Sequence, residues 1–138
     1  MDSLNPQRKA DLMDLFHIER WALLERRAEL LAKTRVIESR LRRLDDAAMI
    51  KQKKKLNDFA ITLKAIDLAV AYRDSARGKE RYEQIYQLQM MILGPNLFEE
   101  DEMDDEELNR IAAVAVPEIE AIAVAEREEG WQIILANM

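Results

Sequence analysis

The residues with the clearest capacity for chemistry are Asp14 and His17, three positions apart in a chain with one histidine and no cysteine. An acidic residue followed three positions later by histidine resembles half of a di-iron bundle site, which needs two such units and two further glutamates. One histidine cannot complete that site unless two chains combine, and zinc ligation by cysteine and histidine is excluded by count. No glycine-rich phosphate loop is present. We therefore expect a non-enzyme without metal or cofactor, with His17 a packed or surface residue.

Carboxylates are concentrated between Glu99 and Glu107, where eight of nine residues are acidic. This run lacks the central glycine and alternating ligands of a calcium loop. We favour a solvated loop and helix start. Docking onto a basic surface, of the same chain or of an external partner, and mimicry of nucleic-acid charge stay open.

Basic residues are concentrated over the sixteen positions from 40 to 55, which hold Arg40, Arg42, Arg43, Lys51, Lys53, Lys54 and Lys55. Such a cluster could follow a phosphate backbone without reading sequence, because no aromatic residue is interleaved to stack on bases. Residues 1–80 carry 18 Lys and Arg against 13 Asp and Glu, whereas residues 81–138 carry 3 against 14. Halves of opposite charge attract one another, within a chain or between copies.

The carboxyl end carries the candidate partner contact, made of Trp131, Ile133, Ile134 and Leu135. Large apolar and aromatic side chains are typical of interface centres. Gly130 precedes the cluster and predicts a helix end, so residues 131–138 form a docking tail. The tail either closes the protein's own bundle or acts as an exposed anchor.

The element that positions most of the chain is a long amino-terminal helix. Large apolar residues recur there at intervals of seven: Phe16, Leu23, Leu30, Ile37 and Leu44. This spacing is typical of a helix that buries one seam against another helix. It predicts a helix over 6–44, about 58 Å long at 1.5 Å per residue, which exceeds a compact domain of this size. We therefore expect a homo-oligomer, most simply a dimer.

The apolar pattern changes phase after Leu44, which predicts a turn capped by Asp45 and Asp46 and a second helix over 46–76. The two helices would form a long antiparallel hairpin resembling a coiled coil. In that register Arg20 lies within about a turn of Asp67 and Asp74, and Arg27 within about a turn of Asp67.

Two further helices are predicted to pack on this hairpin. Gly78 would end the second helix and allow a third over 79–93, with an inner side made of Tyr82, Ile85, Tyr86, Gln89 and Ile92. Gly94-Pro95-Asn96 predicts a break and an acidic loop over 94–104. The fourth helix is expected over 105–129, kinked near Pro117.

The sequence thus predicts one all-α domain. Only three glycines and three prolines interrupt 138 residues, and 49% of the chain is hydrophobic, too much for disorder. No signal-peptide core or membrane-length apolar run is visible, so we expect a cytoplasmic protein. The expected function is protein–protein interaction, as an oligomeric adaptor, inhibitor or assembly component of the kind frequent in phage and mobile elements. Nucleic-acid association through residues 40–55 is the alternative.

Overall fold

The computed structural model describes residues 5–98 and 105–138, and every regular element in these ranges is helical. The helices are α1 (Pro6–Asp14), α2 (Arg20–Arg40), α3 (Asp46–Asp74), α4 (Ala76–Phe98) and α5 (Asp105–Asn137), with short 3₁₀ turns at Leu15–His17 and Leu41–Arg43. The all-α class predicted from composition is confirmed. No described helix has the length and apolarity needed to span a bilayer.

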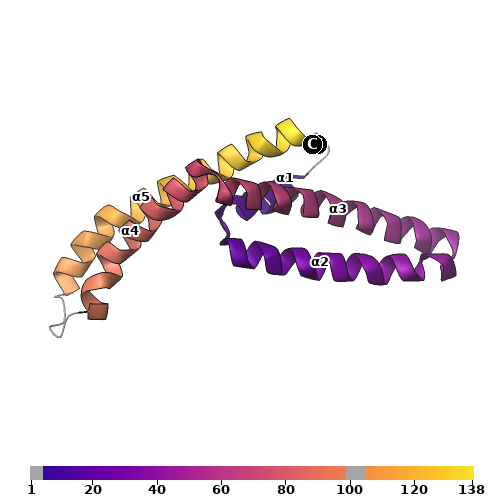
Figure 1. Ribbon diagram of the computed structural model, residues 1–138, viewed down its shortest axis with the longest axis horizontal. Helices are drawn as coiled ribbons and strands as arrows, with labels where there is room; N and C mark the ends of the chain where they lie inside the picture. Colours follow the sequence, from indigo (N-terminus) through magenta and orange to yellow (C-terminus); the bar gives the residue numbers. More distant parts are fainter. Residues whose placement is uncertain (1–4, 99–104) are drawn as a thin grey trace.

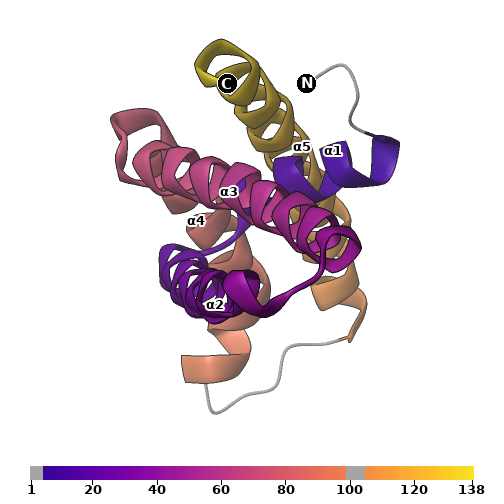
Figure 2. The same cartoon turned by 90° about the vertical axis from the view of Figure 1, so that its right-hand side faces the viewer.

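The helices form two arms that meet at an angle (Figure 1). One arm consists of α2 and α3 side by side, and the other consists of α4 beside the first part of α5. The last part of α5 continues past the meeting point and packs against α1 and α3, as the end-on view in Figure 2 also shows. Because α5 belongs to both the second arm and the meeting point, it ties the arms together.

The hydrophobic core lies at the junction of the arms. Its buried members are Leu12, Leu15, Phe16, Leu23, Ala65, Ile66, Ala69, Tyr72 and Ile134. The Phe16 ring packs edge-on against Tyr72, with centroids 5.8 Å apart. Away from this junction the arms bury few side chains completely, and Ala115 and Ala123 are the buried apolar residues of the described α4–α5 arm.

The prediction of one unbroken helix over 6–44 is wrong. The chain leaves α1 at Asp14 and starts α2 at Arg20, and Ile18 adopts an extended backbone between them. A buried arginine explains the break: Arg73 of α3 donates to the backbone carbonyls of Phe16 and Ile18, at 2.9 and 3.4 Å. These carbonyls gain a charged partner in place of helical hydrogen bonds, and the bend lets Leu12, Leu15 and Phe16 enter one core.

The α2–α3 arm begins and ends with polar contacts that the sequence indicates. Asp45 caps α3 by accepting a hydrogen bond from the Ala48 amide at 2.8 Å. Two expected ion pairs are confirmed, Arg20 Nε to Asp74 Oδ1 at 2.8 Å and Arg27 Nε to Asp67 Oδ1 at 2.9 Å. Since the paired residue number rises on α2 as it falls on α3, the two helices run in opposite directions.

The boundary between α3 and α4 differs from the prediction. The α3 helix ends at Asp74 and α4 begins at Ala76, so Gly78 does not end a helix but lies in the first turn of the next one. The turn falls at Ser75, which is extended and accepts a hydrogen bond from the Gly78 amide at 3.1 Å. Gly78 is needed for a close approach, because a Cβ there would come within 2.9 Å of the Tyr72 carbonyl carbon.

The predicted break at Gly94-Pro95-Asn96 is also wrong, since α4 continues to Phe98. Glycine and proline raise the cost of a helix without forbidding it, and a helix already formed over 76–93 needs no new nucleation. The predicted acidic loop over 94–104 is therefore helical at 94–98, and its remaining residues, 99–104, lie outside the described ranges.

The α5 helix continues past Gly130, the predicted helix end, and contains Pro117, where a kink was predicted. Pro117 and Ala113 are exposed, so the Ala113 carbonyl that loses its helical partner can bond to water. Gly130 is buried against Phe16, and a Cβ there would lie 2.8 Å from the Phe16 Cβ and closer to its ring. Residues 131–137 are consequently the end of α5 and not a separate tail.

Candidate functional site: the elbow groove

A buried charge cluster joins three segments at the junction. Glu126 of α5 is 0% exposed, and its Oε2 lies 3.0 Å from Nη1 of Arg73, itself 8% exposed. The Nδ1 of His17 lies 3.6 Å from the other Glu126 oxygen. The Arg73 guanidinium therefore bridges the chain break at Phe16–Ile18 and the carboxylate of α5. This arrangement joins the two arms at the junction through a fully buried carboxylate and a nearly buried guanidinium.

A second polar cluster links α3, α4 and α5 beside the first. Arg81 donates to the Tyr72 hydroxyl at 2.8 Å and pairs with Glu129, whose other oxygen lies 3.0 Å from Arg77 Nε. Burial raises the pKa of the Tyr72 hydroxyl, against the opposing effect of the Arg81 hydrogen bond. These contacts hold the first turns of α4 against α5.

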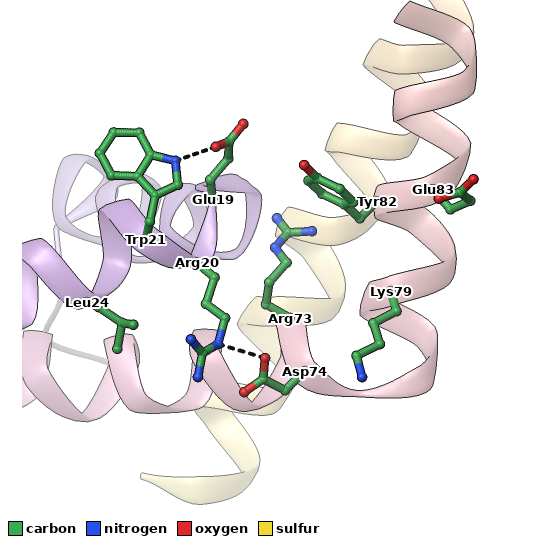
Figure 3. Close-up of a pocket in the computed structure, with 9 residues that line it drawn as sticks. All are labelled: Glu19, Arg20, Trp21, Leu24, Arg73, Asp74, Lys79, Tyr82 and Glu83. Atoms are coloured by element: carbon green, nitrogen blue, oxygen red, sulfur yellow. Dashed lines mark hydrogen bonds and ion pairs between the residues drawn. The ribbon is translucent and has the colours of Figure 1, made fainter. Parts of the chain in front are cut away.

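The junction leaves a groove of about 620 Å³ between α2 and α4, which we call the elbow groove. Its lining residues are Glu19, Arg20, Trp21, Leu24, Arg73, Asp74, Lys79, Tyr82 and Glu83. In Figure 3, Trp21 and Leu24 project from α2 on one side, Tyr82 projects from α4 on the other, and Arg73 lies between them. A smaller pocket shares Glu19, Arg73 and Tyr82 and extends the surface to His17 and Tyr86.

The apolar side chains of the elbow groove are exposed to an unusual degree. Trp21 is 65% exposed and Tyr82 48%, and Leu24 is also exposed; Tyr86 of the adjoining smaller pocket is 51% exposed. The charged residues around them are mostly paired inside the protein: Arg20 with Asp74, Arg73 with Glu126, and Glu19 with the Trp21 indole N–H. Lys79 has no acidic partner among the residues described in the structure. The groove thus offers aromatic contact area, the cation of Lys79 and the carboxylate of Glu83, which is in no ion pair with another described residue.

A second, mainly apolar groove of about 500 Å³ lies on the α4–α5 arm, and we call it the arm groove. Its lining residues are Gln84, Gln87, Leu88, Met91, Glu118, Ala121 and Ile122. Tyr82 and Met91 are nine residues apart on α4, or about 900° at 3.6 residues per turn, so they point to opposite sides of the helix. The two grooves therefore occupy different faces of the protein.

No protein family model, no curated protein and no solved structure matches this chain.

Asp14 and His17 do not come together in a site of the kind that the catalytic and metal interpretations require. The Asp14 carboxylate pairs with Arg127 at 2.9 Å, whereas His17 faces Glu126. Within residues 5–98 and 105–138, no group of three or more His, Asp and Glu residues could hold a metal ion. In the observed geometry, these charged side chains hold the helices against one another.

The basic residues predicted for nucleic acid do come together. All seven, Arg40, Arg42, Arg43, Lys51, Lys53, Lys54 and Lys55, are exposed at the far end of the α2–α3 arm. Ion pairs of the described residues involve none of them. The start of α5, with Glu106 and Glu107, lies at the end of the other arm (Figure 1). Within one chain, these two carboxylates are therefore remote from the basic residues.

The four residues of the predicted carboxyl-terminal contact differ in burial. Ile134 is 0% exposed in the core, and Trp131 and Ile133 pack against that core. Only Leu135 of the four is exposed. A partner-binding role for this cluster stays a prediction and rests on Leu135.

Sequence reasoning missed the residues of the elbow groove. Tyr82 and Tyr86 were expected on the inner side of a helix, yet both are about half exposed. Trp21 carried a usable signal: it lies two residues before the seam residue Leu23, or about 200° around the helix, so an aromatic ring had to point away from the seam. The groove itself could not be predicted, because its two sides meet through the break at residues 15–19.

Proposed function

We propose that this protein is a non-catalytic interaction protein whose elbow groove binds an amphipathic, acidic segment of another protein. The observation that carries the proposal is the convergence of exposed Trp21, Leu24 and Tyr82 from two arms on one groove. Tryptophan and tyrosine dominate the binding energy of protein interfaces, especially where a pocket excludes water around them.

The charges of the groove indicate the chemistry of the partner. Lys79, without an acidic partner in the described chain, would pair with a carboxylate of the bound segment. Six of the nine lining residues are charged, three of each sign, and Arg20 and Arg73 are already paired with Asp74 and Glu126 within the chain. A different protein can offer the complementary pattern.

The test is a quantitative pull-down with the full chain and two groove variants, Trp21→Ala and Tyr82→Ala. Ile50→Ala is the matched control, because Ile50 is 71% exposed but lies on α3 near the basic end. We expect at least one protein to be retained by the wild type and the control and lost by both groove variants. For the purified partner, loss of a hot spot of about 2 kcal/mol raises Kd about 30-fold. Equal retention by all four proteins, or retention of nothing, contradicts the proposal.

The architecture we propose for the first arm is a coiled-coil-like hairpin that carries the groove at one end and the basic residues at the other. The seven-residue spacing of Leu23, Leu30, Ile37 and Leu44 supports it, because all four are buried or half-buried along α2 and its turn. The Arg20–Asp74 and Arg27–Asp67 pairs support its register.

A second candidate function is nucleic-acid binding at the basic end of the α2–α3 arm. The exposure of all seven cations, none of them in an ion pair with another described residue, favours it. Fluorescence anisotropy with duplex DNA and RNA at 50 mM salt tests it, with Lys53→Glu/Lys54→Glu as the variant. Binding should weaken as salt rises, by about 0.9 log units in affinity per log unit of salt for each phosphate contact. No binding at low salt removes this candidate.

A further inference from the structure

The α4–α5 arm has the composition of half a larger bundle. Two antiparallel helices can bury only the stripe where they touch, and on this arm that stripe consists mainly of small residues such as Ala115 and Ala123. Larger side chains remain partly or largely exposed beside it. Met91 is 47% exposed and Val114 58%, and Leu88 and Ile122 of the arm groove are half-buried.

The accessible surface of the whole chain shows how much area is available for a partner. The protein exposes 9689 Å². A compact monomer of its mass, 16.1 kDa, exposes about 7,400 Å² by the usual scaling of surface with mass. The excess of roughly 2,300 Å² is larger than the roughly 800 Å² that each partner contributes to an interface of standard size. Covering the arm groove therefore needs only part of the surplus.

The charge of the arm groove favours a second copy as its occupant. In a two-fold interface the same patch lies on both sides, so a patch whose charges are all of one sign finds no opposite charge across the axis. Among the arm-groove residues Glu118 alone is charged, and it is exposed, so its carboxylate can stay hydrated. The elbow groove differs, because its lining holds three acidic and three basic residues that would have to be matched by opposite charges or stay hydrated.

We propose that two copies of this chain associate through their arm grooves, so that two α4–α5 arms form an antiparallel four-helix bundle around a two-fold axis. The antiparallel order follows from the acidic start of α5. Parallel arms would place Glu107 and its acidic neighbours beside the same residues of the second copy, whereas antiparallel arms place them at opposite ends of the bundle. The elbow grooves stay open in this dimer, because they lie on the other side of α4.

Light scattering coupled to size exclusion, with the full chain from about 1 to 100 µM, tests the proposal. The expected mass of the wild type is twice 16.1 kDa, or 32.2 kDa. Met91→Glu introduces two facing carboxylates into the apolar patch and should give 16.1 kDa with unchanged helical circular dichroism. Ala121→Glu, at an exposed position of the same groove, is the second variant in case the first fails to fold.

Ile50→Glu is the matched control for an added carboxylate at an exposed apolar site and should remain dimeric. Trp21→Ala should also remain dimeric, which separates this interface from the proposed function of the elbow groove. A wild type that is monomeric over the whole range overturns the proposal. So does a dimer that both arm-groove variants leave intact, or one that Ile50→Glu dissociates while they do not.

Discussion

The two arms of the protein are both antiparallel helix pairs attached to one core, but charged residues are distributed differently on them. The α2–α3 arm has two exposed ion pairs in the part nearer the junction and ends in seven exposed cations. The α4–α5 arm is joined by small residues near its middle, and the groove on its outer side is almost uncharged. A surface that carries many charges of one sign repels its own copies and suits different partners, whereas an almost uncharged groove can meet a second copy of itself.

The arms also differ from the junction that carries them. The junction holds nearly all of the fully buried side chains and the buried Arg73–Glu126 pair, and the arms hold mainly half-buried seams. Stability should therefore depend steeply on the junction and weakly on the contacts of either arm.

The largest effect is expected from Glu126→Ala, because it leaves the Arg73 guanidinium buried without its counter-charge. Breaking such a pair costs about 3–5 kcal/mol in the free energy of unfolding. Urea denaturation followed by circular dichroism measures it. Glu128→Ala, two residues away on an exposed face of α5, is the control and should stay within about 0.5 kcal/mol of wild type. Equal losses in the free energy of unfolding for the two variants would contradict the claim that stability depends steeply on the junction.

A smaller loss is expected from Gly130→Ala, which places a methyl group against the Phe16 ring. Overpacking of this kind costs about 1–3 kcal/mol. Phe16→Leu should relieve part of the clash, so the double variant should be less destabilised than the sum of the single variants. Strict additivity would mean that Gly130 does not serve to admit the Phe16 ring.

The ion pairs of the α2–α3 arm should contribute little. A double-mutant cycle on Arg27→Ala and Asp67→Ala should give a coupling of about 0.2–1 kcal/mol, since both side chains are about half exposed. Raising the salt to 1 M, where the screening length is about 3 Å, should reduce it further. A coupling that is large and independent of salt is the behaviour expected of a buried pair such as Arg73–Glu126, and it would contradict this prediction.

The smallest effect concerns alkaline pH at Tyr72. Burial raises the pKa of its hydroxyl above the unfolded value of about 10, so the folded state holds this proton more tightly. The contribution is fully present below about pH 10 and is lost as the pH rises through the folded pKa. Tyr72→Phe should reduce the alkaline loss of stability relative to wild type, whereas Tyr82→Phe on the exposed side of α4 should not. Equal alkaline slopes in both variants would contradict this account of Tyr72.

Much of the α2–α3 arm could be predicted from sequence because its information is local. The seven-residue spacing, the Asp45 cap and the positions of Arg20 and Arg27 depend on helix periodicity alone. The break at residues 15–19 could not be predicted in this way. It depends on Arg73, more than fifty positions away, which supplies partners to two carbonyls that a helix would otherwise satisfy.

The same distinction explains the errors in the carboxyl-terminal half. Gly78 and Gly130 are typical of helix ends when only neighbours in sequence are considered. In the structure each permits a close approach, Gly78 to the Tyr72 carbonyl and Gly130 to Phe16. The elbow groove was missed for the same reason, since its aromatic rings come from helices that meet only through the bent junction.

The central claim is that the junction holds the two arms at one fixed angle, so that the elbow groove is a single preformed surface. Because the chain has no cysteine, spin labels can be attached at Ile50→Cys and Val116→Cys, exposed positions on the two arms. Pulsed electron–electron double resonance, with labelled protein diluted into unlabelled protein, reports the distance between the two spin labels within one chain. The account predicts one narrow distance distribution that broadens when Glu126→Ala is added. A broad or two-peaked distribution without that substitution would contradict it.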